Sequence, residues 1–207
     1  MTKTTEKATE EVILDAALAV FTRKGFAAAR TEEIAREAGI NRALLHYYYR
    51  DKQTMFDLIF EKRFSEFFKG LFVIFDADNI SLHEKIRRMI DHEITTLLKH
   101  PDLPRFIITE IAHQPERLLT YGQKMGLNPR IMIAGFEDLV KKEVEAGTIK
   151  PVNGRTLLIN IMSLCIYPFV ASPVIRTMMQ LNEHDFEQLM EGRKKEIYEF
   201  IINSIKK

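Results

Sequence analysis

A short strip of side chains between residues 42 and 47 combines one cation, two apolar groups and two aromatic groups that can donate hydrogen bonds. Its members are Arg42, Ala43, Leu44, His46 and Tyr47. An arginine guanidinium can donate two parallel hydrogen bonds to guanine, and an alkyl side chain can contact a thymine methyl group. We therefore expect this strip to read base edges in the major groove of double-stranded DNA.

Groups beside the strip are suited to hold the DNA backbone. The hydroxyls of Tyr47 and Tyr48, the cations Arg50 and Lys52, and the amino end of a helix that starts near Thr31 can all bind phosphate oxygens. Phosphate contacts fix the position of a protein on the duplex, whereas base contacts specify the sequence. The two sets together predict a specific DNA contact.

The three consecutive tyrosines at 47–49 have an alternative interpretation as half-buried core aromatics. A rotation of about 100° per residue places Tyr49 on the same side of the helix as Leu45, which we expect to face inward. We favour the core interpretation for Tyr49 only. A helix of three turns has one inner face, so Tyr47 and Tyr48 are left for phosphate contact.

Two short helices that meet at a tight glycine turn must carry this strip. Thr31 is expected to cap the second helix, Gly39 to end it, and Asn41 to cap the third. Such a pair is a helix-turn-helix. The first helix is expected to end at Gly25, and residues 1–9 to form a flexible polar arm. The expected helices of this part cover residues 10–24, 31–38 and 42–50.

Helix-period apolar patterns continue to the end of the chain, with scarce Gly and Pro between them and no alternating strand pattern. The expected fold is all-α, with a three-helix DNA-binding domain over 1–52 and a larger helical ligand-binding and dimerisation domain over 53–207. Residues 115–128 and the piece around Pro173 are expected to be irregular. The later helices are expected at 52–75, 82–100, 103–113, 131–146, 155–171 and 184–205.

The residues from 12 to 60 resemble the DNA-binding domain of the TetR (tetracycline-repressor) family. The resemblance rests on ILDAALAVFTRKGF and TEEIAREAGINRALLHYYYRDKQTMFDLI, a joint pattern over about fifty residues. The rest of the chain matches that family only in length and helical character. The resemblance implies that DNA contacts come from Thr31, Asn41, Arg42, Ala43, Leu44, His46, Tyr47, Tyr48 and Lys52.

Several positions depart from the family pattern. Members commonly carry threonine where this chain has Leu44, tyrosine at His46, histidine at Tyr48 and glycine at Ala43. Leu44 replaces a hydrogen-bonding side chain with an alkyl one, so the favoured base should change. The operator sequence therefore cannot be predicted from the resemblance.

The resemblance also implies a homodimer in which the last two long helices pair with their copies as a four-helix bundle. A dimer places two reading helices about 34–36 Å apart, which matches a palindromic operator. The alternative is that both apolar stripes are core within one chain. The stripes are Leu157, Leu158, Ile161, Met162, Cys165, Ile166 and Phe169, and Phe186, Leu189, Met190, Ile197, Phe200, Ile201 and Ile205.

A phenylalanine-rich helix over 56–75 has more apolar positions than one packing stripe needs, which suggests a wall of a ligand cavity. Aromatic and methionine walls favour a small apolar or aromatic ligand. For any single residue, ordinary core is the alternative. The candidate liners are Phe64, Phe68, Met89, His92, Ile108, His113, Met125, Met132, Phe136 and Phe169.

These features predict a ligand-responsive transcriptional regulator, a repressor whose ligand shifts the population of reading heads away from groove spacing. An activator is an open alternative. A ligand that binds tightly without changing operator affinity would contradict this coupling.

Other chemistries find little support. No nucleophile elbow, phosphate loop or dinucleotide fingerprint occurs, and the six histidines have no metal-ligand spacing. We expect no catalytic residue, metal or cofactor, an inert buried thiol at Cys165, and a soluble cytoplasmic protein without a membrane partner. The net charge of +1 decides nothing. The rival classes are a helical enzyme or ligand carrier, and a non-inducible architectural DNA binder.

Overall fold

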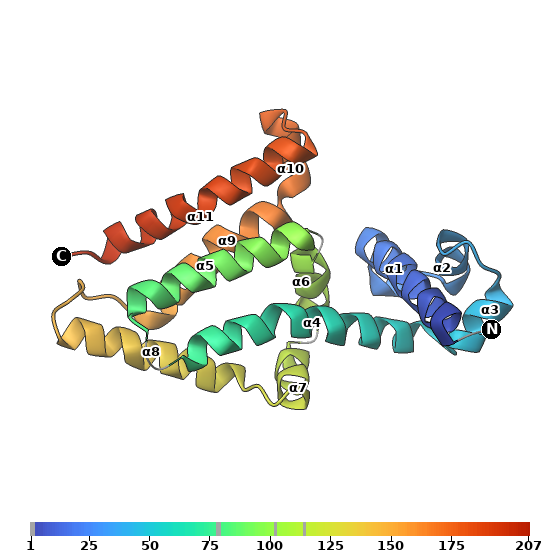
Figure 1. The fold of residues 1–207 in the computed structure, drawn as a ribbon, viewed down its shortest axis with the longest axis horizontal. Helices are drawn as coiled ribbons and strands as arrows, with labels where there is room; N and C mark the ends of the chain where they lie inside the picture. The colour runs from blue at the N-terminus through green and yellow to red at the C-terminus, as the bar shows by residue number, and fades with distance from the viewer. Residues whose placement is uncertain (1–2, 78–79, 102, 114) are drawn as a thin grey trace. The chain divides into compact units, whose positions relative to one another are not determined.

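The computed structural model describes residues 3–77, 80–101, 103–113 and 115–207, and in these ranges the chain is built from α-helices (Figure 1). The expected all-α fold is confirmed, and the described residues form one isolated β-bridge, between Ile149 and Lys206, but no strand. The helices are α1 (Lys3–Ala28), α2 (Thr31–Glu37), α3 (Arg42–Tyr48), α4 (Lys52–Asp76), α5 (Leu82–Lys99), α6 (Leu103–His113), α7 (Glu116–Lys124), α8 (Pro129–Glu145), α9 (Gly154–Val170), α10 (Ser172–Met179) and α11 (Glu183–Ile205).

The chain divides into two compact units. The first contains residues 1–65 and 105–115, and the second contains 66–104 and 116–207. The first unit thus extends past residue 52, where we expected the DNA-binding domain to end. The reason is that the first half of α4 is buried in it, and α4 continues into the second unit.

An aromatic cluster forms the core of the first unit. The ring of Phe56 on α4 lies 5.4 Å from Phe21 and 4.9 Å from Phe26, and 5.3 Å from Phe106 on α6. Phe60, one turn further along α4, also packs against Phe106, at 6.0 Å. These contacts explain why α6, distant in sequence, belongs to the unit that holds the helix-turn-helix.

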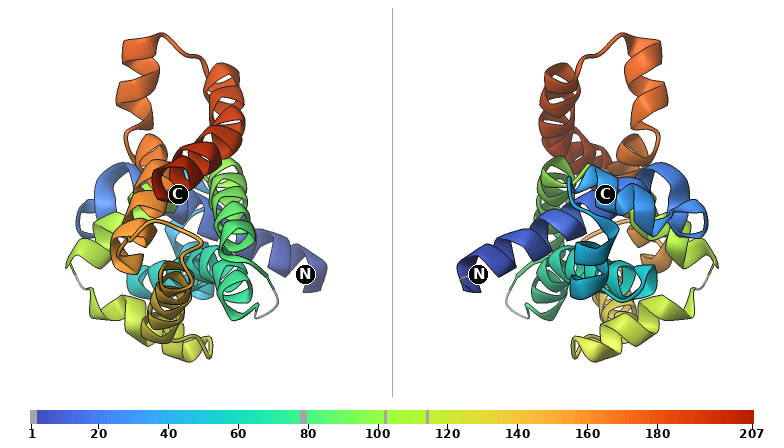
Figure 2. Two further views of the ribbon diagram at one scale, coloured as in Figure 1. Left: turned by 90° about the vertical axis from the view of Figure 1, so that its left-hand side faces the viewer. Right: turned by 90° about the vertical axis from the view of Figure 1, so that its right-hand side faces the viewer.

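The second unit is organised around α5, which packs against α8, α9 and α11. Its buried stripe includes Ile86, Ile90, Ile94 and Leu97. The same stripe carries Glu93, whose side chain is completely buried. Figure 2 shows α10 and α11 joined by a short connection in this unit, where Gln180 adopts a left-handed conformation with φ of 54°.

Some sequence-based expectations about helices were wrong. The first helix begins at Lys3 instead of residue 10, so residues 3–9 belong to it. Thr31 is the first residue of α2, and Arg30 occupies the cap without a side-chain hydrogen bond. Residues 116–124 form α7, and Pro173 lies in the first turn of the helix α10.

Among the described residues, no single helix is long and apolar enough to cross a membrane. The pair α9 and α10, bent by 69°, reaches that length only when both helices are counted together.

Candidate nucleic-acid interface

The helix α3 is anchored on one side and open on the other. Leu45 is fully buried, and Tyr49 just after the helix is 8% exposed. Asn41 caps the amino end as predicted, because its side-chain oxygen accepts a 2.8 Å hydrogen bond from the backbone N–H of Leu44. Burial raises the pKa of Tyr49, with the charge of Glu10 as a second cause, which fits a core tyrosine.

The opposite side of α3 presents the predicted reading strip to solvent. Tyr47 is 76% exposed, and its ring meets the Tyr48 ring edge-on at 5.3 Å. Of the residues expected to contact DNA, five are exposed: Asn41, Arg42, Ala43, His46 and Tyr47. The other four are half-buried: Thr31, Leu44, Tyr48 and Lys52.

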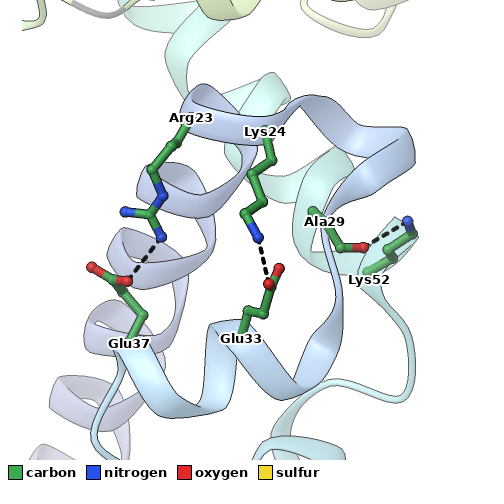
Figure 3. Close-up of polar contacts among 6 residues, drawn as sticks. All are labelled: Arg23, Lys24, Ala29, Glu33, Glu37 and Lys52. Atoms are coloured by element: carbon green, nitrogen blue, oxygen red, sulfur yellow. Dashed lines mark hydrogen bonds and ion pairs between the residues drawn. The ribbon is translucent and has the colours of Figure 1, made fainter.

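Two ion pairs attach α2 to the end of α1 (Figure 3). Arg23 lies 3.1 Å from Glu37, and Lys24 lies 2.5 Å from Glu33. The hydrogen bond from Lys24 is the main reason why the pKa of Glu33 lies below its ordinary value. These pairs were not predicted, and they hold the helix before the reading helix in place.

Lys52 has a structural part that we did not predict. Its ammonium group donates to the backbone carbonyls of Phe26 at 2.8 Å, Ala27 at 3.2 Å and Ala29 at 2.9 Å, and lies 4.6 Å from the centre of the Phe26 ring. Figure 3 shows the bond to Ala29. An ammonium has three N–H donors. In this conformation none is left for a phosphate, so Lys52 is removed from the expected contacts.

The first turn of α4 has a capping group that we also missed. Asp51 accepts hydrogen bonds from the backbone N–H of Thr54 at 2.7 Å and from its hydroxyl at 3.0 Å. These two bonds are the main reasons why the pKa of Asp51 is lowered. An aspartate directly before a helix was the available sequence signal.

The candidate ligand-lining residues do not form one set. Phe64 and Ile108 belong to the first unit, and Ile108 is exposed, whereas the other described members belong to the second. The side chain of His113 lies outside the described residues. Of the remaining candidates, three are buried: Met89, Phe136 and Phe169. Four are partly exposed: Phe68, His92, Met125 and Met132.

Two of these candidates line pockets of the second unit. Phe169 lines a pocket of about 740 Å³ between α9, α10 and α11, with Phe186 5.8 Å away from it, ring centre to ring centre. His92 lines a separate pocket with residues of α4, α5 and α11. Its Nε2 atom lies 2.9 Å from the carbonyl oxygen of Phe67.

Most of the predicted dimer stripe is buried within the single chain, which corrects that prediction. A side chain covered by its own chain has no surface for a second copy, so the intramolecular alternative holds for these residues. They are Leu157, Leu158, Ile161, Phe186, Met190, Ile197 and Ile201. Met162 is partly exposed, and larger apolar exposure occurs at Ile159 and Tyr167 on α9 and at Leu189 and Phe200 on α11.

Comparison with known proteins gives two family matches. Residues 13–59 match the model described as bacterial regulatory proteins, tetR family, and residues 83–201 match the tetracyclin repressor-like C-terminal domain. The HTH-type transcriptional repressor SCO4008 of Streptomyces coelicolor is 32% identical over 127 residues, which cover 58% of this chain. The match spans 62% of that relative, less than two thirds of its length.

Two further comparisons cover more of the chain. The HTH-type transcriptional repressor NicS of Pseudomonas putida is 26% identical over 164 residues, 77% of this chain and 74% of the relative. The solved structure of the ketosteroid transcriptional regulator KstR2 of Mycobacterium tuberculosis superposes with a TM-score of 0.70 at 16% identity. That superposition covers 96% of this chain and 95% of the other, which shows a shared fold.

Proposed function

The chain belongs to the TetR family of bacterial transcriptional regulators, and we propose that it is a cytoplasmic repressor that binds a palindromic operator as a homodimer and is released by a small apolar or aromatic ligand. The observation that carries the proposal is the exposed strip on α3. Arg42, Ala43, His46 and Tyr47 face solvent together, while Leu45 anchors the opposite side. That arrangement leaves base-reading groups free to enter a major groove.

The operator contact is tested by selecting binding fragments from the DNA that flanks the gene, and by comparing Arg42→Ala with the native protein in a gel shift at fixed salt. We expect the variant to lose about 1–3 kcal/mol at one base pair, about five- to 150-fold in affinity. Arg130→Ala, which changes an exposed arginine of α8, is the matched control.

Three outcomes separate the possibilities. Absence of any retained fragment refutes DNA binding. An equal loss by Arg42→Ala on all sequences reassigns Arg42 to the phosphates. An equal loss by Arg42→Ala and Arg130→Ala shows that the strip on α3 has no special part.

The proposed dimer uses exposed faces of α9 and α11. Leu189 and Phe200 lie about 20° apart around α11, so they form one line along that helix. Gly192 lies between them in the sequence, about 60° around the helix from Leu189. A Cβ added there would have no neighbour within 4 Å, and a bare backbone beside this line lets a second helix approach closely. Ile159 and Tyr167 give α9 a comparable exposed face.

For the ligand, we propose the pocket between α9, α10 and α11. Its volume of about 740 Å³ is within the range of small-molecule sites. Phe169 and Phe186 supply aromatic surface, and Arg176 and Gln180 supply polar groups that could orient a ligand. The fold neighbours include regulators named for ketosteroid and for fatty acid degradation, at 16% and 15% identity. They share the fold, and the ligand class proposed here depends on the pocket residues.

The ligand site is tested with a panel of steroids and fatty acids in a thermal-shift assay, followed by operator binding. A ligand that stabilises the native protein should fail to stabilise Phe169→Ser and should weaken operator binding by the native dimer. Met132→Ser, on α8 away from the residues that line this pocket, is the control. Unchanged stabilisation of Phe169→Ser would place the ligand elsewhere.

A further inference from the structure

The three acidic residues of α2 have different partners. Glu33 and Glu37 pair with Lys24 and Arg23 of α1 and thus attach α2 to the preceding helix. Glu32 instead pairs with Arg42, the first residue of α3, with Oε1 and Nη1 3.0 Å apart. One acid of α2 is therefore directed at the reading helix.

This third pair differs from the others in what it can do. The side chains of Glu32 and Arg42 are 55% and 62% exposed, and an ion pair in solvent contributes little to folding stability. Arg42 is, however, the only lysine or arginine in α3. Glu32 therefore neutralises the one fixed positive charge of the reading helix in the free protein.

We propose that Glu32 is a built-in competitor for Arg42 that lowers the affinity of the protein for DNA and reduces the salt dependence of binding. The inference rests on the proposed DNA-binding function. While Nη1 of Arg42 is paired with Glu32, the charge of Arg42 is already compensated and only its remaining N–H groups can approach a base or phosphate. Binding therefore weakens the pair or brings the Glu32 carboxylate close to the phosphate backbone, where like charges repel.

The size of the effect follows from the exposure of the pair. Exposed ion pairs correspond to a change of up to about fivefold in an equilibrium constant. Glu32→Gln keeps the shape of the side chain and removes its charge. We expect the variant to bind DNA about two- to fivefold more tightly at low salt. Arg42 then neutralises a phosphate without freeing a carboxylate, so the slope of log affinity against log salt should steepen by up to about 0.9.

The experiment uses the full chain and a labelled duplex of arbitrary sequence, with affinity measured between about 50 and 200 mM salt. Glu37→Gln is the matched control, because it removes the same charge from the same helix but frees Arg23 of α1 instead of Arg42. The double variant Glu32→Gln with Arg42→Ala is compared with Arg42→Ala alone. Unfolding midpoints of all variants are measured to show that the fold is retained.

Each outcome has a defined meaning. Tighter binding and a steeper salt slope for Glu32→Gln, both lost in the Arg42→Ala background, support the competitor. A gain equal to that of Glu37→Gln overturns it, because any negative charge would then act alike. A gain that persists without Arg42 also overturns it, since Glu32 would then act directly on the phosphates. Failure of the native protein to bind any duplex at low salt would instead refute the proposed function.

Discussion

Glu93 on α5 should make the stability of the protein depend on pH, and Glu93→Gln should remove that dependence. Its side chain is completely buried. The neighbours are the thiol of Cys165 on α9, which favours the ionised form slightly, and Arg193 on α11, whose charge acts on that thiol. Burial dominates and raises the pKa of Glu93 from 4.5 to about 7.

The sign follows from the protons bound in each state. Between pH 4.5 and about 7 the folded protein holds a proton on Glu93 that the unfolded chain has lost, so the free energy of unfolding falls as pH rises through that window. The fall is about 1.4 kcal/mol per pH unit, or about 3 kcal/mol in all, and it levels off above pH 7. Below pH 4.5 Glu93 is protonated in both states, and the stability is no longer reduced by its burial.

Urea unfolding of the native protein and of Glu93→Gln from pH 4 to pH 9 measures this dependence, since the amide carries no charge. We expect similar stabilities at the acid end and a Gln variant that is more stable by up to about 3 kcal/mol above neutral pH. Glu187→Gln, which changes an exposed acid of α11, is the control. Parallel stability curves for the native protein and Glu93→Gln would refute the reasoning.

Three other changes have defined outcomes. Lys52→Met should destabilise the protein by about 1.5–3 kcal/mol in urea unfolding, because a charged donor to three carbonyls is lost; an unchanged midpoint would return Lys52 to the phosphates. Gly70→Ala should lower the free energy of unfolding by about 1–3 kcal/mol, because its Cβ would lie 2.0 Å from the His92 ring. Gly135→Ala is the control: its Cβ would have open space, so the free energy of unfolding should rise by about 1 kcal/mol. Phe200→Asp should give a monomer in analytical ultracentrifugation, while Met178→Asp on α10 should not; equal effects would contradict the proposed dimer face.

The sequence predicts contacts between neighbouring residues well. Asn41 caps α3 by accepting from the backbone N–H of Leu44, three residues later, and the inward side of Leu45 follows from helical rotation alone. The partners of Lys52 lie 23 to 26 residues earlier in the chain, so only the folded backbone brings them to the ammonium group. The sequence therefore predicts a phosphate contact for Lys52 and gives no sign of its carbonyl partners.

Helical period identifies an apolar face but not the partner that covers it. Ile161 on α9 and Ile197 on α11 were assigned to a second copy, and the chain covers both itself. The expectation of an irregular piece around Pro173 was also wrong. Pro173 lies in the first turn of α10, where proline lacks an N–H that would be unpaired in any case.

The carbonyl contacts of Lys52 have a mechanical consequence. They join the first residue of α4 to the end of α1 and to Ala29 just after it. A hinge at the junction between α3 and α4 would therefore have to break three hydrogen bonds and a cation–aromatic contact at once. The first turn of α4 is therefore rigidly attached to the helix-turn-helix. A rotation of this end of α4 moves the end of α1 with it.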